Sequence, residues 1–254
     1  MKSKHQRYFI EIAFNGGAYH GWQAQPNAVT VQELLEKALA TLFRQPVATT
    51  GCGRTDAGVH ARQLYAHFDV TDAADFIQSS EKVLHSLNAL LPHDIAAKRL
   101  IAVSPEAHAR FDAVKRSYEY HIHFEKNPFL TGLSWQMHGI PDVSAMNEAA
   151  RLLLQYTDFA CFSKSNTQVG TFNCTLMHAE WQWTADRRLV FYISADRFLR
   201  NMVRAVVGTL LEIGRNEKPV DHIHAVIASK NRSVAGTSVP AHGLYLTEVV
   251  YPYI

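Results

Sequence analysis

Residues 31–43, VQELLEKALATLF, carry apolar side chains at helical spacing and predict an amphipathic helix. Apolar alternation on both sides of this helix predicts strands. The elements expected around it are strands over Arg7–Phe14, Pro46–Cys52 and Leu64–Val70, a helix over Ser80–Leu90, and a strand over Ile95–Val103. The first half of the chain is therefore predicted as β-α-β-β-α-β.

The second half repeats this order of elements. We expect strands over Ser117–Phe124, Leu176–Thr184, Leu189–Ala195 and Gly243–Tyr251, and helices over Val143–Gln155, Phe198–Ile213 and Val220–Ser229. Two such repeats predict an α+β protein of two tandem ferredoxin-like subdomains, with sheets side by side and a central cleft. The stretch Ser104–Val114 is the best candidate for a boundary between the two subdomains. We therefore assign residues 1–104 to the first subdomain and residues 105–254 to the second.

The composition of the 254-residue chain, 47% hydrophobic and 19% charged, is that of a folded protein and excludes extensive disorder. No apolar run approaches the ~20 residues of a membrane span, and the first residues lack the core of a signal peptide. The three cysteines, Cys52, Cys161 and Cys174, form no CxxC pair. We expect a soluble, cytoplasmic protein with no membrane partner and no disulfide scaffold.

Positive charge is concentrated in one region of the chain. The formal net charge is only +2, yet Arg187–Arg232 holds nine Lys or Arg against four Asp or Glu. This surplus is compatible with a phosphate-rich partner, and equally with a solvated helix face.

The densest polar cluster is Gly51-Cys52-Gly53-Arg54-Thr55-Asp56-Ala57-Gly58-Val59-His60-Ala61-Arg62, between two predicted strands. Its glycines allow the backbone to fold tightly around Asp56 or allow a ligand to approach closely. The alternative is a hairpin loop in which Asp56 only caps a turn. The cluster is not a GxGxxG fingerprint or an Asp-Thr-Gly protease motif, and Gly16–Trp22 lacks the lysine of a P-loop.

A second cluster spans Asp196–Arg204, at the start of a predicted helix. Arg197, Arg200 and Arg204 recur at i, i+3 and i+7, so we expect them to share one helix face that could bind phosphates. Arg204 precedes an apolar run, and a buried guanidinium needs a carboxylate partner, for which Asp56 is a candidate. The alternative is a solvated basic face with Arg204 in a structural ion pair.

Lys115 and Arg116 precede alternating tyrosines, Tyr118 and Tyr120, on a predicted strand. Tyrosine faces on a sheet serve as platforms for unstacked bases, although strand packing explains them equally well. The pairs His121 with His123 and His222 with His224 lack a third ligand nearby, so we interpret them as surface histidines and expect no metal site.

These residues resemble the TruA-type tRNA pseudouridine synthases. The resemblance extends in order over nearly the whole chain. The matching segments are Gly21-Trp22-Gln23-Ala24-Gln25-Pro26, Gly53–Ala61, Ala107-His108-Ala109-Arg110-Phe111, Arg116–Tyr120, Phe198–Arg204 with Gly208-Thr209-Leu210, and Pro240–Leu246. Phe14-Asn15-Gly16 and Thr157-Asp158-Phe159 depart from the family pattern, and Ser163–Cys174 lacks an arginine often found there.

The resemblance implies isomerisation of uridine to pseudouridine at positions 38 to 40 of the tRNA anticodon stem-loop, by a homodimer without cofactor or metal. Asp56 would be the nucleophile, Arg204 its ion-pair partner, and Tyr118 a stacking residue that helps to remove the C5 proton. Arg54 would flip the uridine and Leu244 would line an apolar wall. The expected tRNA contacts are Ala107, His108, Ala109, Arg110, Phe111, Lys115, Arg116, Arg197 and Arg200.

Two other classes of protein compete with this interpretation. A non-catalytic RNA-binding module explains the basic and aromatic residues, but it gives no reason for Asp56 beside Arg54, because a carboxylate repels phosphate. An acid/base hydrolase would need a second carboxylate in a matching motif, which the sequence lacks. Synthase activity is therefore the favoured prediction.

Overall fold

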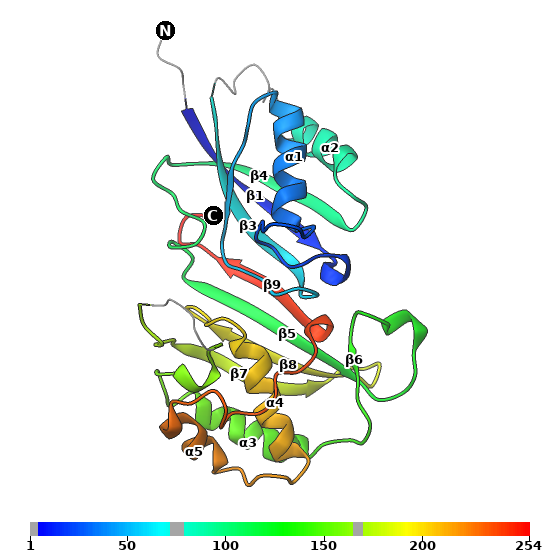
Figure 1. The fold of residues 1–254 in the computed structure, drawn as a ribbon, viewed down its shortest axis with the longest axis vertical. Helices are drawn as coiled ribbons and strands as arrows, with labels where there is room; N and C mark the ends of the chain where they lie inside the picture. The colour runs from blue at the N-terminus through cyan, green and yellow to red at the C-terminus, as the bar shows by residue number, and fades with distance from the viewer. Residues whose placement is uncertain (1–4, 72–78, 165–169) are drawn as a thin grey trace. The chain divides into compact units, whose positions relative to one another are not determined.

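The computed structural model describes residues 5–71, 79–164 and 170–254. The described part is of the α+β class, as predicted, with α-helices interspersed among β-strands along the chain (Figure 1). It divides into two compact units: unit 1 comprises Met1–Val114 and Leu246–Ile254, and unit 2 comprises Lys115–Tyr245. No helix of the described ranges is long and apolar enough to cross a membrane.

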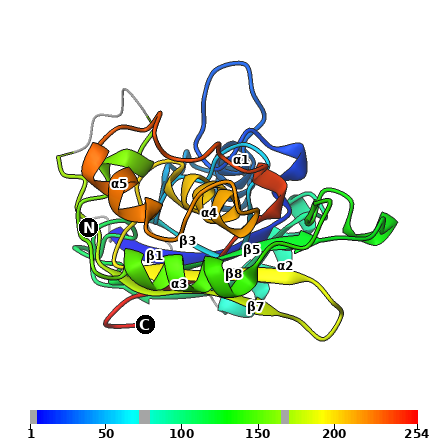
Figure 2. The ribbon, with the colours of Figure 1, turned by 90° about the horizontal axis from the view of Figure 1, so that it is seen from below.

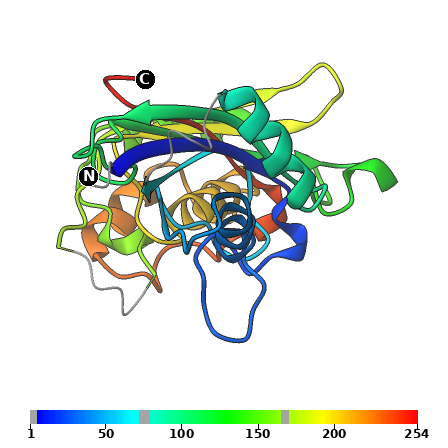
Figure 3. The same ribbon diagram turned by 90° about the horizontal axis from the view of Figure 1, so that it is seen from above.

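Unit 1 is built on a set of antiparallel strands. Its elements are β1 (His5–Phe14), α1 (Val31–Phe43), β2 (Thr49–Gly51), β3 (His60–Thr71), α2 (Ser80–Leu90) and β4 (Ile95–Val103). The strand order is β4-β1-β3, with β2 beside β3. Helices α1 and α2 contact each other, and α1 is seen nearly end-on in Figure 3.

Helix α1 shows why the predicted boundaries hold. The Thr30 side chain accepts a hydrogen bond from the Glu33 N–H at 3.4 Å, which caps the first turn, and Arg44 ends the helix in a left-handed conformation. The buried face faces the sheet, where Phe43 packs on Phe68 with ring centroids 6.0 Å apart. The predicted helices over Val31–Phe43 and Ser80–Leu90 are confirmed at both ends.

Unit 2 again combines strands with helices, and a short additional strand, β6, lies between its first strand and its first helix. Its elements are β5 (Lys115–His123), β6 (Trp135–Gln136), α3 (Val143–Leu153), β7 (Leu176–Trp183), β8 (Leu189–Ala195), α4 (Met202–Gly214) and α5 (His222–Ser229). The strand order is β5-β8-β7, antiparallel, with the short β6 parallel to β5. Helix α3 contacts both α4 and α5 (Figure 2). Strand β9 (Leu244–Val250) begins in unit 2 and continues into unit 1, where it lies next to β3.

The core of unit 2 is formed by its strands together with α3, which contacts β7, and the buried helix α4. Trp181 on β7 and Phe191 on β8 are buried with ring centroids 4.9 Å apart. Asn147 of α3 holds the outer side of β7: its amide nitrogen donates to the Trp181 carbonyl at 3.0 Å, and its amide oxygen accepts from the Trp181 N–H at 2.7 Å. These two bonds satisfy backbone groups that β8 does not pair.

Helix α4 begins four residues later than predicted. Asn201 precedes it with a φ of 66°, a left-handed conformation that asparagine tolerates better than most residues, so the helix starts at Met202. Arg197 and Arg200 therefore lie before the helix, and the predicted helix face shared with Arg204 is wrong.

Candidate active site

The Asp56 loop, residues 52–59, connects β2 to β3 in unit 1. Asp56 is half-buried, Arg54 is exposed, and Thr55 between them is buried. The Asp56 carbonyl accepts a hydrogen bond from the Val59 N–H at 3.1 Å, which closes a turn after the carboxylate. The loop thus presents Asp56 and Arg54 together at the surface of unit 1.

Residues 16–22 fix this loop through main-chain contacts. The Gly58 N–H donates to the Tyr19 carbonyl at 3.2 Å, and the Trp22 N–H donates to the Thr55 carbonyl at 3.4 Å. Gly21 has a φ of 87°, and a β-carbon there would lie 2.3 Å from the Thr55 carbonyl oxygen. Only glycine permits this close approach beside Asp56.

Side chains support the same segment from two sides. The Tyr19 hydroxyl donates to the Asp94 carboxylate. The buried His60, the first residue of β3, accepts the Gly16 N–H through Nδ1 at 3.0 Å. These contacts join residues 16–22 to β3 and to Asp94, the residue just before β4. Residues 16–22 in turn hold the Asp56 loop.

In unit 2, Tyr118 and Arg204 occupy different elements. Tyr118 on β5 is half-buried and packs edge-on against Phe198 at 5.1 Å. Arg204 on α4 is half-buried, and its Nε donates to the Val239 carbonyl at 2.7 Å. One edge of this guanidinium therefore holds the backbone that leads to Leu244.

Tyr120 fixes the next residue of that backbone. Its fully buried hydroxyl donates to the Pro240 carbonyl at 2.9 Å, and burial raises the pKa of this phenol, so it stays protonated and donates. A β-carbon on Gly243 would lie 2.8 Å from Tyr120 Cζ and 3.0 Å from the His121 carbonyl oxygen. The segment therefore packs directly on the Tyr120 ring just before Leu244, which is itself buried.

The predicted tRNA-contact residues differ in exposure. Ala107 and Ala109 are buried and His108 is half-buried, whereas Arg110 and Phe111 are exposed, with the Arg110 guanidinium 5.6 Å from the centre of the Phe111 ring. Lys115 and Arg197 are half-buried and Arg200 is exposed. Arg116 is buried and donates to the Asp196 carbonyl at 2.9 Å.

Two cysteine thiols are unsuited to nucleophilic chemistry at neutral pH. Burial raises the pKa of Cys161 to about 12 and that of Cys174 to about 11. Both thiols therefore stay protonated at neutral pH.

The interpretation of His121 and His123 as surface histidines is wrong, since both are buried on β5. His121 Nε2 lies 2.8 Å from the Glu119 carboxylate, and its ring packs against Tyr245 at 4.9 Å. His222 is half-buried and His224 is exposed. The described residues contain no group of three or more His, Cys, Asp or Glu side chains placed to hold a metal ion.

The supporting residues Tyr19, His60 and Tyr120 were not predicted from the sequence. Each contacts a segment far away in the chain, from 44 residues for His60 and Gly16 to 120 for Tyr120 and Pro240. A polar group at a buried position of an apolar strand, as at His60, is the one sequence feature that could have indicated such a contact.

The family model described as tRNA pseudouridine synthase matches residues 149–252. Over nearly its whole length, the chain is similar to proteins named tRNA pseudouridine synthase A. That of Parabacteroides distasonis is 51% identical over 97% of this chain and 96% of its own length, and that of Bacteroides fragilis is 50% identical over 97% of each. That of Bacillus subtilis is 38% identical over 94% of this chain and 97% of its own length.

The α+β architecture and this similarity define a pseudouridine synthase, an enzyme of RNA modification. More narrowly, the chain belongs to the tRNA pseudouridine synthase A family.

Proposed function

We propose that this enzyme converts uridine to pseudouridine at positions 38, 39 and 40 of the tRNA anticodon stem-loop. In this isomerisation the N1–C1′ bond of the nucleoside breaks and a C5–C1′ bond forms. The C5 proton leaves to solvent and N1 takes up a proton, so atoms and charge balance without a redox step. The proposal needs no cofactor and no metal ion.

Asp56 is the proposed nucleophile, and the anchored loop is the observation that carries the assignment. The Tyr19 carbonyl accepts from the Gly58 N–H and the Trp22 N–H donates to the Thr55 carbonyl, so the main chain is held on both sides of Asp56. Attack on C1′ or on C6 of the base needs the ionised form, which a guanidinium partner stabilises. We assign that partner role to Arg204, whose Nε is held by the Val239 carbonyl.

Tyr118 is proposed to stack on the uracil and to help remove the C5 proton from the rotated base. Leu244 is proposed to line the apolar wall of the pocket, since Tyr120 and Gly243 fix the segment that leads to it. A stem uridine must leave its stack, at a cost of a few kcal/mol. Arg54, exposed two residues before Asp56, is the proposed flipping residue.

The proposed tRNA surface comprises Ala107–Phe111 together with Lys115, Arg116, Arg197 and Arg200. We further propose two ferredoxin-like subdomains, residues 1–104 and 105–254, that form one catalytic domain with a central cleft. The strand order β4-β1-β3-β2 of unit 1 supports the ferredoxin-like description of the first subdomain. By resemblance to its family, the enzyme would act in the cytoplasm as a homodimer.

Tritium release from tRNA labelled at uracil C5 tests the proposal. Unmodified tRNA incubated with the wild-type enzyme should release tritium to water, and Asp56→Asn should release none while still binding tRNA. Asp186→Asn, in the exposed turn between β7 and β8, is the matched control and should keep wild-type release. Undiminished release by Asp56→Asn would falsify the nucleophile assignment, and no release by the wild type would overturn the proposed activity.

A further inference from the structure

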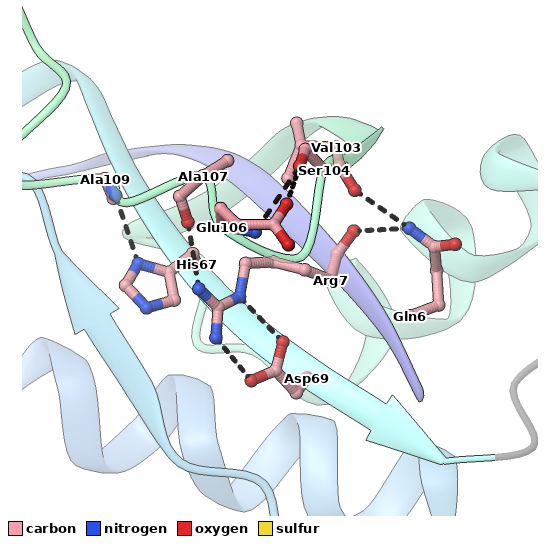
Figure 4. Close-up of polar contacts among 9 residues, drawn as sticks. All are labelled: Gln6, Arg7, His67, Asp69, Val103, Ser104, Glu106, Ala107 and Ala109. Carbon is pink, nitrogen blue, oxygen red and sulfur yellow. Dashed lines mark hydrogen bonds and ion pairs between the residues drawn. The ribbon is translucent and has the colours of Figure 1, made fainter. Parts of the chain in front are cut away.

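The segment 104–112 of unit 1 is held by side chains of strands β1 and β3. Arg7 on β1 and Asp69 on β3 are direct cross-strand partners, and His67 lies two residues before Asp69 on the same side of β3. Figure 4 shows Arg7 pointing at the backbone of Ala107 and His67 at that of Ala109, while the Asp69 carboxylate points at the Arg7 guanidinium.

Arg7 binds two groups at once. Its Nε and Nη2 form a bidentate pair with the Asp69 carboxylate, at 2.8 and 2.7 Å, and its Nη1 donates to the Ala107 carbonyl at 3.0 Å. The Arg7 side chain is 19% exposed and the Asp69 side chain 47% exposed, and the pair is a charge-assisted bidentate one. Asp69 thereby orients the guanidinium so that its Nη1 donates to the Ala107 carbonyl.

His67 holds the second point of the segment. The Ala109 N–H donates to His67 Nδ1 at 3.1 Å, and the Tyr251 hydroxyl donates to the Ala109 carbonyl at 2.6 Å. A side chain of β3 and one from the residue just after β9 therefore satisfy both backbone groups of Ala109. Burial, with smaller effects of Arg7 and His108, lowers the pKa of His67 to about 4, so at neutral pH Nδ1 keeps the lone pair that this bond requires.

Contacts within the segment complete its shape. His108 Nδ1 accepts the N–H groups of Arg110 and Phe111 at 3.1 and 3.3 Å. The Asp112 carboxylate accepts the His108 N–H at 2.7 Å and the Tyr253 hydroxyl at 2.8 Å. The outcome is that Ala107 and Ala109 face inward, whereas Arg110 and the 74% exposed Phe111 project outward.

We propose that Arg7 and His67 are positioning residues for tRNA binding, which fix the main chain at Ala107 and Ala109 so that Arg110 and Phe111 are presented to the RNA. The inference rests on the proposed function and extends it to two residues outside the matching family segments. An arginine beside an exposed aromatic ring offers one group for a phosphate and one for an unstacked base.

The physical gain is preorganisation. A segment already held in its bound conformation loses less conformational entropy when RNA binds than one that must order during binding. Loss of Arg7 or His67 should therefore weaken tRNA binding while the chemical step on bound tRNA proceeds at its normal rate.

The test compares two substitutions of His67. His67→Leu removes the acceptor, whereas His67→Asn places an amide oxygen where Nδ1 was. We expect His67→Leu to raise the Kd for unmodified tRNA about tenfold, with single-turnover tritium release at saturating enzyme unchanged, and His67→Asn to restore most of the affinity. His85→Leu, an exposed histidine on α2 of the same unit, is the matched control and should bind as the wild type does.

A double-mutant cycle separates positioning from general structural support. In the background Arg110→Ala/Phe111→Ala, adding His67→Leu should have little further effect, because the groups that it positions are gone. Additive effects would overturn the proposal, as would unchanged affinity in His67→Leu. If His67→Leu fails to fold, Arg7→Gln takes its place in the same cycle. Wild-type tritium release fails only if the proposed function itself is wrong, so the two failures are distinguishable.

Discussion

His60 and His67, seven residues apart on β3, make the same kind of contact. Each accepts a backbone N–H through Nδ1, from Gly16 at 3.0 Å and from Ala109 at 3.1 Å. Because the ring nitrogen that accepts must be unprotonated, both imidazoles carry the acceptor at Nδ1. On this one strand, His60 holds the segment that supports the Asp56 loop, and His67 holds the segment that carries Arg110.

Replacing His60 should impair turnover more than binding. His60→Leu leaves the buried Gly16 N–H unsatisfied, at a cost of about 1–3 kcal/mol, and loosens the segment that anchors Asp56. We expect lower stability in urea unfolding and slower single-turnover tritium release, both partly restored in His60→Asn. Wild-type stability and turnover in His60→Leu would show that the Gly16 contact has no such role.

Gly21→Ala should slow catalysis strongly. The new β-carbon would lie 2.3 Å from the Thr55 carbonyl oxygen, on a residue whose φ of 87° already disfavours alanine. The Asp56 loop must move, and a displacement on the order of 1 Å costs about 100-fold in rate. The measurement is kcat for tritium release. Gly53→Ala in the same loop is the control, since its β-carbon meets nothing within 4 Å. Equal rates for the two variants would contradict the prediction.

Gly243→Ala should destabilise unit 2 and displace Leu244. Its β-carbon would overlap the buried Tyr120 ring and the His121 carbonyl, and overpacking of this kind costs about 1–3 kcal/mol. A lower melting temperature by scanning fluorimetry checks this expectation. The comparison is Gly170→Ala, where nothing lies within 4 Å of the added carbon. The same melting temperature for both variants would rule out the tight contact.

The stability of the protein should fall in mild acid, partly because of His67. Its pKa is lowered from 6.5 to about 4, so between these values the unfolded chain binds a proton that the folded chain does not. The free energy of unfolding therefore decreases as the pH falls through this window, by at most about 1.4 kcal/mol per pH unit for one proton. In His67→Asn no imidazole is present at position 67 to take up this proton in the unfolded chain. The free energy of unfolding of this variant in urea should therefore depend less on pH between about 7 and 5. Identical pH dependence in the two proteins would contradict the prediction.

Local patterns predicted most of the secondary structure. The helices α1 and α2 begin after Thr30 and Ser79, residues that favour the start of a helix, and their apolar spacing continues to the predicted ends. The prediction failed at α4, where apolar periodicity continues through Phe198 but the left-handed Asn201 interrupts the helical backbone. A single dihedral angle of this kind has no counterpart in hydrophobic periodicity.

The sequence also pointed to Asp56, Arg54 and the segment Ala107–Phe111. It could not indicate what holds them, because those contacts join residues distant in the chain. Arg7 and Ala107 are 100 residues apart, and Ala109 and Tyr251 are 142 apart. Such pairs are determined by the order and register of the strands, which the sequence pattern of each strand alone does not specify.

The contact between Asn147 and Trp181 has a consequence for how the enzyme behaves at high concentration. Strand β7 ends the strand order of unit 2, and unpaired N–H and C=O groups along such a strand invite association with strands of other molecules. The Asn147 amide occupies both outward backbone groups of Trp181 in the manner of a neighbouring strand. A helix side chain thus protects the middle of this strand against intermolecular β-pairing, and Asn147→Ala should make the protein more prone to aggregate.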